Sequence, residues 1–406
     1  MVAHNATMEA RPSDDLGLYL HVPFCARKCP YCDFNTYAGL ESRFGSYVDA
    51  LCREIALRRA AEPAAVDRVV TSVFLGGGTP TVLSTAQLAQ ILGAVRDHLT
   101  LAADVEITSE ANPGTVDAER FAGLRAIGVN RLSLGAQSLR RGELAFLGRI
   151  HGAAEVGAAV RAARAAGFDN MNLDFLFGLP GQSARAWRET LARALDLGTD
   201  HLSLYSLIVE PETPLQRWVA SGAVAAPDDD AAARRYQTAM RVLATAGFGH
   251  YEVSNWSRSP AHRSRHNLLY WRNGEYLAFG AGAHGHIRTR DADGRLHDVR
   301  WSNDRPVDAY IARVQAGELP VAFREDVSPA AAMGETMMVG LRLVDEGVAH
   351  ARFADLHGAD PRQVYAAVLA ELSDWGLVDV DAHRTRLTRR GLMVGNQVFG
   401  RFAADV

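Results

Sequence analysis

The amino-acid sequence predicts an α/β protein: a partial, TIM-like barrel of six β/α units, followed by a small C-terminal helical domain with a winged-helix-like pattern. Two observations support this fold class. Between residues 16 and 209, short apolar runs alternate six times with amphipathic or alanine-rich stretches, as is typical of parallel strands with crossover helices. From residue 306 onward, helical patterns come first and a short pair of strands follows.

The alternation alone fits a doubly wound sheet as well as a barrel. Polar residues that can carry chemistry follow several different strands, which favours the barrel, because parallel barrels gather functional residues at the C-terminal ends of many strands. We expect the strands at Leu16–His21, Val69–Leu75, Val105–Glu110, Val129–Leu134, Met171–Phe177 and His201–Val209. The amphipathic stretches predict helices at Phe44–Arg59, Thr85–His98, Ala118–Ile127, Ala154–Ala166 and Ala184–Leu197.

Residues at the helix ends support these assignments. Ser84 and Gln87 have the spacing of a capping box, in which the two side chains satisfy free backbone N–H groups of the first helical turn. Gly128, Gly167 and Gly198 stand where a helix is expected to end, and glycine adopts the left-handed conformation needed there without steric cost.

The chain of 406 residues is long enough for one α/β domain of about 200 to 250 residues and a smaller second domain. We expect a flexible N-terminus at 1–15, the barrel at 16–253, a connecting region at 254–305 and the winged-helix-like domain at 306–406. The wing of this last domain is predicted at 376–380 and 386–388.

The composition argues against several functional classes. A net charge of −4 gives no general electrostatic case for nucleic acid, and residues 301–406 hold 11 Arg against 15 Asp and Glu, so a nucleic-acid-reading wing is not expected. No apolar run approaches the roughly 18 residues of a membrane span, and the first fifteen residues are too polar for a signal peptide. Four cysteines, three of them clustered, indicate a reducing compartment and hence the cytoplasm.

The clustered cysteines, Cys25, Cys29 and Cys32, follow the spacing C-x3-C-x2-C. Three thiolates on one loop can bind three corners of a cubane iron–sulfur cluster, and because full ligation takes four, one iron stays open for a small molecule. The alternatives are a zinc knuckle, which lacks a fourth ligand here, and buried core thiols. Cys52 lies in a helical pattern and is expected to be a core residue.

The motif and its flanks, Tyr19–Phe24 and Tyr31–Phe34, resemble the radical S-adenosylmethionine (SAM) superfamily. The most similar branch holds the oxygen-independent coproporphyrinogen III oxidases and the HemW-like heme chaperones, and the resemblance runs from about Leu16 to about Phe399. It implies an open six-unit barrel, a [4Fe-4S] cluster on the three cysteines, and SAM chelated by the open iron.

The resemblance also implies a set of SAM contacts. Gly76–Pro80, after the second strand, matches the family's motif for the SAM amino group. Asp174 lies in an apolar strand and needs a partner, for which Arg149 is expected, so a purely structural Asp–Arg pair is the alternative. The residues expected to contact SAM are Tyr19, Gly77, Gly78, Thr79, Glu110, Gln137, Arg149 and Asp174, and whether one or two SAM molecules bind is left open.

A second motif, His266–Trp271, reads His-Asn-Leu-Leu-Tyr-Trp. If it is helical, His266 and Tyr270 share one face and place an imidazole beside aromatic surface, which suits a heme because imidazole is a common axial ligand. It resembles the H-N-x-x-Y-W motif of HemW-like heme chaperones, which implies that His266 binds heme. The alternatives are a hydrogen-bonded structural His266, or a ligand among His262, His284 and His286.

One departure from the family pattern decides between its two branches. Phe34 stands two positions after Cys32, where the oxidases have a further cysteine, and this argues against decarboxylation of coproporphyrinogen. The resemblance therefore implies a heme chaperone that binds a [4Fe-4S] cluster, SAM and one heme, and transfers heme to an unidentified acceptor protein, which can be membrane-associated. The alternative is an oxygen-independent coproporphyrinogen III oxidase, and whether SAM is cleaved is left open.

Overall fold

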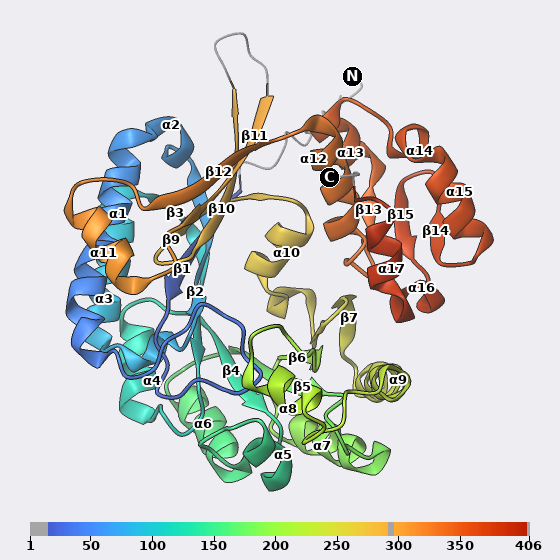
Figure 1. Cartoon of the computed structure of the whole chain (residues 1–406), viewed down its shortest axis with the longest axis horizontal. Coiled ribbons are helices and arrows are strands. Elements are labelled where there is room, and N and C mark those ends of the chain that lie inside the picture. The colour runs from blue at the N-terminus through green and yellow to red at the C-terminus, as the bar shows by residue number, and fades with distance from the viewer. Residues whose placement is uncertain (1–14, 291–295, 404–406) are drawn as a thin grey trace, which may run out of the picture.

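Six parallel strands form the centre of the fold, and the computed structural model, which describes residues 15–290 and 296–403, arranges them as the predicted open barrel (Figure 1). Most of their side chains are buried on both faces, as the apolar runs require, and the exposed positions lie at the strand ends and in the first half of β3. All six predicted strands are confirmed: β1 (Leu16–Val22), β2 (Val69–Gly77), β3 (Thr100–Ala111), β4 (Arg131–Gln137), β5 (Asn170–Phe177) and β6 (His201–Ser206).

Helices cover the outer side of this curved sheet (Figure 1). The five predicted helices are confirmed as α1 (Phe44–Ala61), α3 (Thr85–His98), α4 (Ala118–Ala126), α6 (Ala153–Ala165) and α7 (Ala184–Asp196). Further helices are α2 (Pro63–Val66), α5 (Arg141–Phe146), α8 (Pro214–Ala220), α9 (Asp229–Thr245), and the 3-10 turns η1 (Glu41–Arg43), η2 (Pro80–Val82) and η3 (Pro260–His262).

The predicted caps are also present. The Gln87 N–H donates to Ser84 Oγ at 3.2 Å, and the Ser84 N–H donates to Gln87 Oε1 at 2.9 Å, which completes the capping box of α3. Gly128, Gly167 and Gly198 have φ angles of 101°, 85° and 68°. These values lie in the left-handed region, so the three glycines end their helices for the conformational reason expected.

The sheet continues on both sides of the six parallel strands, to twelve strands in all among the described residues. Beyond β6 lie β8 (Asn255–Ser257) and β7 (Gly249–Glu252), and beyond β1 lie β9 (Glu275–Phe279), β10 (His284–Arg290), β11 (Leu296–Asn303) and β12 (Val321–Val327). The segment 254–305, expected to be a connection, thus supplies four strands and the helix α10 (Arg265–Trp271).

The C-terminal helical domain begins later than residue 306. Helix α11 (Val307–Gln315) belongs to the barrel side, because Tyr310 donates to Glu54 of α1 at 2.6 Å, and β12 pairs with β11. The helical domain then consists of α12 (Pro329–Gly340), α13 (His350–His357), α14 (Pro361–Val364), α15 (Ala366–Asp374), α16 (Arg389–Met393) and α17 (Gly395–Gly400). Its predicted wing is present as β14 (Val378–Val380) and β15 (Arg384–Leu387), joined by β13 (Val348–Ala349).

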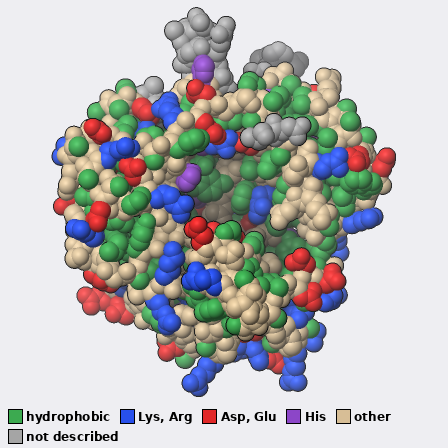
Figure 2. Space-filling model, viewed as in Figure 1, with side chains coloured by type: hydrophobic (Ala, Val, Ile, Leu, Met, Phe, Trp, Pro, Cys, Tyr) green, Lys and Arg blue, Asp and Glu red, His purple; other side chains and the backbone are tan. Residues whose placement is uncertain are grey.

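Figure 2 shows acidic and basic side chains interspersed over the visible face, which is hollowed near its centre. Within the described ranges, no helix has both the length and the apolar character needed to span a membrane. The expected flexible N-terminus falls almost wholly outside the described residues, since only Asp15 is included.

Candidate functional site

The loop after β1 carries the three clustered cysteines to the rim where the parallel strands end. The Cys25 N–H donates to the Tyr37 carbonyl at 2.9 Å and closes the base of this loop, while the Cys32 N–H donates to the Cys29 carbonyl at 3.2 Å and makes its turn. All three thiols are free and partly buried. They line a cavity of about 430 Å³, which we call the rim cavity.

The rim cavity has the free thiols that an iron–sulfur cluster needs. The thiolates of a cubane cluster bind three different irons, so the three sulfur atoms need not converge on one point. Burial raises the pKa of the Cys25 and Cys32 thiols, so a positively charged metal centre is needed to hold them as thiolates at neutral pH.

Polar side chains from neighbouring loops reach two of the sulfur atoms. Arg149, between α5 and α6, donates to Cys29 Sγ at 3.5 Å, to the Gly135 carbonyl at 2.8 Å and to Asn112. Asn112 in turn donates to Thr79 Oγ1 at 2.7 Å, and Thr79 donates to Cys25 Sγ at 3.7 Å. Donors of this kind stabilise thiolate charge, so this network holds the cysteine loop and also favours metal-bound sulfur.

The glycines after β2 are required by packing against β1 and the loop that follows it. A Cβ atom on Gly77 would lie 2.5 Å from the His21 ring, and Gly77 has a φ of 106°. A Cβ atom on Gly78 would lie 2.5 Å from the Phe24 carbonyl oxygen. The Thr79 N–H donates to that same oxygen at 2.7 Å, so the close approach fixes Thr79 against the cysteine loop.

Two carboxyl groups face the rim cavity from β3 and β5. Burial, and then the charge of Asp174, raise the pKa of Glu110 to about 8. Burial also raises the pKa of Asp174, although Ser133 and Asn172 donate to its carboxylate at 3.0 and 2.8 Å. A bound cation would favour the ionised form of both groups, which makes this wall suitable for a positively charged ligand.

The expected Asp174–Arg149 ion pair is wrong. Within the described residues, the Asp174 carboxylate is held by Ser133 and Asn172, while the Arg149 guanidinium is held by Cys29, Asn112 and the Gly135 carbonyl. The sequence could not separate these cases because both residues do need partners, and only the fold shows that they find different ones.

Gln137 has an unfavourable backbone conformation at the rim where the parallel strands end. It is a non-glycine residue with a φ of 64°, at the irregular end of β4 where the register with β5 shifts. A left-handed conformation is uncommon for a side chain of this size and is often retained at binding sites. Gln137 lines the rim cavity at this position.

Of the eight residues expected to contact SAM, seven line the rim cavity: Gly77, Gly78, Thr79, Glu110, Gln137, Arg149 and Asp174. Tyr19 lies instead in the barrel interior, where its hydroxyl bonds His21 Nδ1 at 3.0 Å and its ring stacks on Phe74. Burial, and then the charge of Glu110, raise the pKa of Tyr19.

His266 lies on helix α10, so the condition under which His266 and Tyr270 share one face is met. Its side chain is only 1% exposed, and both ring nitrogens are engaged: Nδ1 with Ser72 Oγ at 3.0 Å and Nε2 with the Tyr270 hydroxyl at 2.9 Å. Burial lowers the pKa of His266 to about 3, so the imidazole is neutral. In this geometry His266 is a hydrogen-bonded interior histidine whose ring also stacks on Phe74.

The same fold and sequence features occur in known proteins. The model of the radical SAM superfamily matches residues 19–194, and the model of the HemN C-terminal domain matches residues 327–394. A protein named heme chaperone HemW in Mycobacterium tuberculosis is 40% identical over 390 residues, with 95% of this chain and 94% of that protein covered. The chain belongs to the HemW family of radical SAM proteins.

Two further similarities extend along the chain. The heme chaperone HemW of Bacillus subtilis is 35% identical over 389 residues, which cover 96% of this chain and 99% of that protein. The solved structure of coproporphyrinogen III oxidase (HemN) from Escherichia coli has a TM-score of 0.80 at 22% identity and covers 97% of this chain and 91% of its own, which shows a shared fold. Membership in the radical SAM superfamily implies a [4Fe-4S] cluster and SAM.

Reasoning from the sequence missed several residues that line the cavity, among them Asn112, Ser133 and Tyr205. Asn112 carried a signal, because it stands directly after β3 in the same motif as Glu110. Ser133 lies between the buried Leu132 and Leu134 in β4, and Tyr205 follows the buried Leu204 in β6, so each points to the opposite face of its strand from a core leucine.

The three other histidines near the α10 motif differ in their surroundings. His286 is buried between the Gly274 carbonyl, at 3.1 Å, and Asp298. His262 Nδ1 bonds Ser259 Oγ at 3.0 Å in η3, and His284 is exposed at the start of β10. Cys52 packs partly buried against the core with its thiol donating to the Gln90 carbonyl, in agreement with the structural role expected for it.

Proposed function

We propose that this protein is a heme chaperone, which holds a [4Fe-4S] cluster on Cys25, Cys29 and Cys32, binds SAM in the rim cavity, carries one heme and passes it to an acceptor protein. The observation that carries this proposal is the similarity along nearly the whole chain to relatives named heme chaperones. The cluster, when bound, supplies an open iron and an electron-transfer centre.

The rim cavity supports SAM binding through the chemistry of its walls. SAM carries an ammonium, a carboxylate and a sulfonium, and the cavity offers Glu110 and Asp174 for positive groups and Arg149 for a negative one. Gly77, Gly78 and Thr79 contribute backbone groups, and Gln137 contributes an amide. Tyr19 is not among the residues that line the cavity, and its contact with SAM stays a prediction.

His266 remains the proposed heme ligand, provided that one of its ring nitrogens becomes free to bind iron. Iron needs a free ring nitrogen, and Nε2 is occupied by the Tyr270 hydroxyl. Coordination therefore requires this hydrogen bond to break and α10 to open, which makes heme uptake at His266 a gated, slow step. The neutral state of the imidazole favours coordination, because only the neutral ring has a lone pair to offer.

The test is anaerobic reconstitution of the cluster followed by heme titration, monitored by the heme Soret band. The parent chain is expected to bind one heme, and His266→Ala is expected to weaken binding and change the spectrum. A His266→Ala chain that binds heme with the affinity and spectrum of the parent removes His266 from the proposal. A parent chain that assembles no iron–sulfur cluster or binds no heme overturns the proposal as a whole.

The second candidate function is an oxygen-independent coproporphyrinogen III oxidase, favoured by the HemN-like fold. Phe34 argues against it, since this side chain is 63% exposed in the wall of the rim cavity, where the oxidase branch has a further cysteine. Incubation with coproporphyrinogen III, SAM and a reductant decides the question. Formation of protoporphyrinogen IX would establish the oxidase and displace the chaperone.

We also propose that the protein acts in the cytoplasm and that its acceptor is a protein, membrane-associated acceptors included. The clustered free thiols support a reducing compartment. Recovery of the native protein in a washed membrane fraction, in the absence of acceptor, would contradict this location.

A further inference from the structure

Asn112 joins two side chains that donate hydrogen bonds to different cysteines of the loop. Its Nδ2 donates to Thr79 Oγ1 at 2.7 Å, and the Thr79 hydroxyl donates to Cys25 Sγ at 3.7 Å. Its Oδ1 accepts a hydrogen bond from Arg149, which also donates to Cys29 Sγ at 3.5 Å. Both ends of one amide are therefore engaged, and a single side chain fixes the direction of both donors.

The chemistry of the partners fixes the orientation of the Asn112 amide. A guanidinium has donors only, so the atom that faces Arg149 must be the amide oxygen, and the amide nitrogen faces Thr79. Thr79 Oγ1 thus receives a proton from Asn112, and its own proton points to the Cys25 sulfur. Because Thr79 is only 2% exposed, solvent has almost no access to this hydroxyl.

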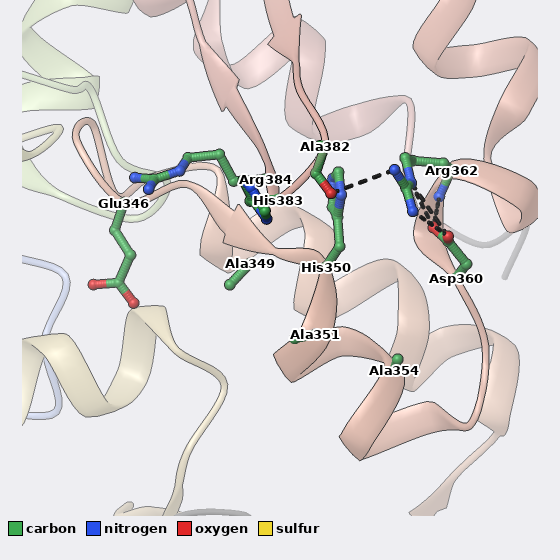
Figure 3. A pocket seen from close by; sticks show the side chains of 10 residues that line it. All are labelled: Glu346, Ala349, His350, Ala351, Ala354, Asp360, Arg362, Ala382, His383 and Arg384. Carbon is green, nitrogen blue, oxygen red and sulfur yellow. Dashed lines mark hydrogen bonds and ion pairs between the residues drawn. The ribbon is translucent and has the colours of Figure 1, made fainter. Parts of the chain in front are cut away.

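The Arg149 guanidinium has no carboxylate partner among the described residues and contacts Cys29 Sγ, Asn112 and the Gly135 carbonyl. Arg362 shows the more usual arrangement, on the wall of a cavity of about 490 Å³ in the C-terminal domain. There the guanidinium donates to the Asp360 carboxylate at 2.7 Å (Figure 3). A partly buried guanidinium without such a partner favours negative charge beside it, which a metal-bound Cys29 sulfur supplies.

The backbone around Asn112 is fixed on two sides. In the turn after β3, the Asn112 carbonyl accepts hydrogen bonds from the Thr115 N–H at 3.2 Å and the Thr115 hydroxyl at 2.8 Å. From β4, Gly135 leaves room for the amide, since a Cβ atom there would lie 3.1 Å from Asn112 Oδ1 and 3.3 Å from an Arg149 nitrogen. The amide is thus placed by a closed turn and by the close approach of a strand.

Cys29, Thr79, Asn112 and Arg149 form a partition between two cavities. All four line the rim cavity, and all four also line a separate hollow of about 20 Å³. That volume is about what one water molecule needs. Because the partition has open space on both sides, its hydrogen bonds keep the donors in place, and loss of the Asn112 amide would leave both donors free to turn toward water.

We propose that Asn112 is a positioning residue for the cluster, which holds the Thr79 hydroxyl against Cys25 and the Arg149 guanidinium against Cys29 and thereby raises the reduction potential of the bound [4Fe-4S] cluster. This inference rests on the cluster-binding part of the proposed function. Reduction adds one negative charge to the cluster and its thiolates. Hydrogen-bond donors and positive charge near the sulfur atoms therefore stabilise the reduced form more than the oxidised form.

The test is a redox titration of the full-length, cluster-reconstituted chain without SAM, followed by the EPR signal of the reduced cluster. Asn112→Ala should lower the ratio of reduced to oxidised cluster at a fixed potential about tenfold, which is a downward shift of about 59 mV for one electron. Thr79→Val removes one donor and should shift the midpoint in the same direction. In the Asn112→Ala background, Thr79→Val should have less than half of its effect in the parent, because the hydroxyl is no longer held there.

Thr115→Val is the matched control, since it removes a hydroxyl from the same turn that bonds the Asn112 carbonyl and not its side chain. It should keep the parent potential. If Asn112→Ala assembles no cluster, Asn112→Asp takes its place. An aspartate of similar size would pair with Arg149 and accept from Thr79, so both donors would turn away from sulfur and the potential should fall.

Three results would overturn the inference and leave the proposed function standing. They are a parent potential in the Asn112 variant, additive shifts in the double variant, and an equal shift in Thr115→Val. A parent chain that assembles no cluster refutes the proposed function itself, so the two failures are distinguishable.

Discussion

If His266 binds heme iron as proposed, the Tyr270 hydroxyl blocks its Nε2 in this structure, and Tyr270→Phe tests the effect of that block. In the parent, Nε2 of a neutral imidazole is engaged by this hydroxyl at 2.9 Å, and the buried His266 ring packs edge-on against the Tyr270 ring. Removing the hydroxyl leaves Nε2 without its partner, which should lower the free energy of unfolding by about 1 to 3 kcal/mol. The phenylalanine ring keeps the packing of Tyr270, so no large cavity forms.

The same substitution should strengthen heme binding. If iron must displace the hydroxyl, the parent loses a hydrogen bond on binding that is worth about 0.5 to 1.5 kcal/mol, and the variant does not. A difference of about 1.4 kcal/mol corresponds to a tenfold change in the dissociation constant. We therefore expect Tyr270→Phe to be less stable in urea denaturation and to bind heme up to about tenfold more tightly in a Soret titration.

Ser72→Ala is the matched control, because it removes the hydrogen bond on the opposite ring nitrogen, Nδ1, at 3.0 Å. It should cost similar stability but leave Nε2 blocked, and so should not tighten heme binding. Heme affinity that is unchanged or weaker in Tyr270→Phe, or equally strengthened in Ser72→Ala, would refute the role of His266 as a gated ligand.

Three further predictions concern the core and the rim cavity. Gly78→Ala places a Cβ atom 2.5 Å from the Phe24 carbonyl oxygen. It should destabilise the fold by about 1 to 3 kcal/mol and lower the amount of iron bound per chain after reconstitution. Gly45→Ala, on α1 with no atom nearby, should have neither effect. The pKa of His266 is about 3 in the folded state and 6.5 in the unfolded state, so the folded state binds fewer protons between these values. The stability that His266 contributes is therefore complete above pH 6.5 and falls by about 1.4 kcal/mol per pH unit toward pH 3. The free energy of unfolding of His266→Gln should depend less steeply on pH in acid denaturation. Because the pKa of Glu110 is about 8, the affinity for SAM measured by calorimetry should rise from pH 7 to pH 9 as this carboxylate ionises. Glu110→Gln should abolish that rise. A parent chain whose SAM affinity does not change with pH would exclude Glu110 as the partner of a cationic group.

The sequence by itself determined the barrel and the cysteine site. Period and apolar content fix which residues form each strand, and glycine fixes where helices end, since these are local properties of the chain. The short spacing of Cys25, Cys29 and Cys32 places them on one loop whatever the rest of the fold does. The glycines after β2 and the acidic residue Glu110 follow directly from strand ends, which meet at one rim in any parallel barrel.

Only the tertiary structure decided which side chains meet. In the folded chain Asp174 accepts a hydrogen bond from Ser133, and Arg149 donates to Cys29 rather than to Asp174. These partners come from segments far apart in the sequence. The tertiary structure buried His266 between Ser72 and Tyr270, although the same hexapeptide on a surface would present a free imidazole. The antiparallel pairing of β13 with β15 also brings His350 and His383 to the same cavity of the C-terminal domain. Burial and partner choice are long-range properties, and no local pattern of residues encodes them.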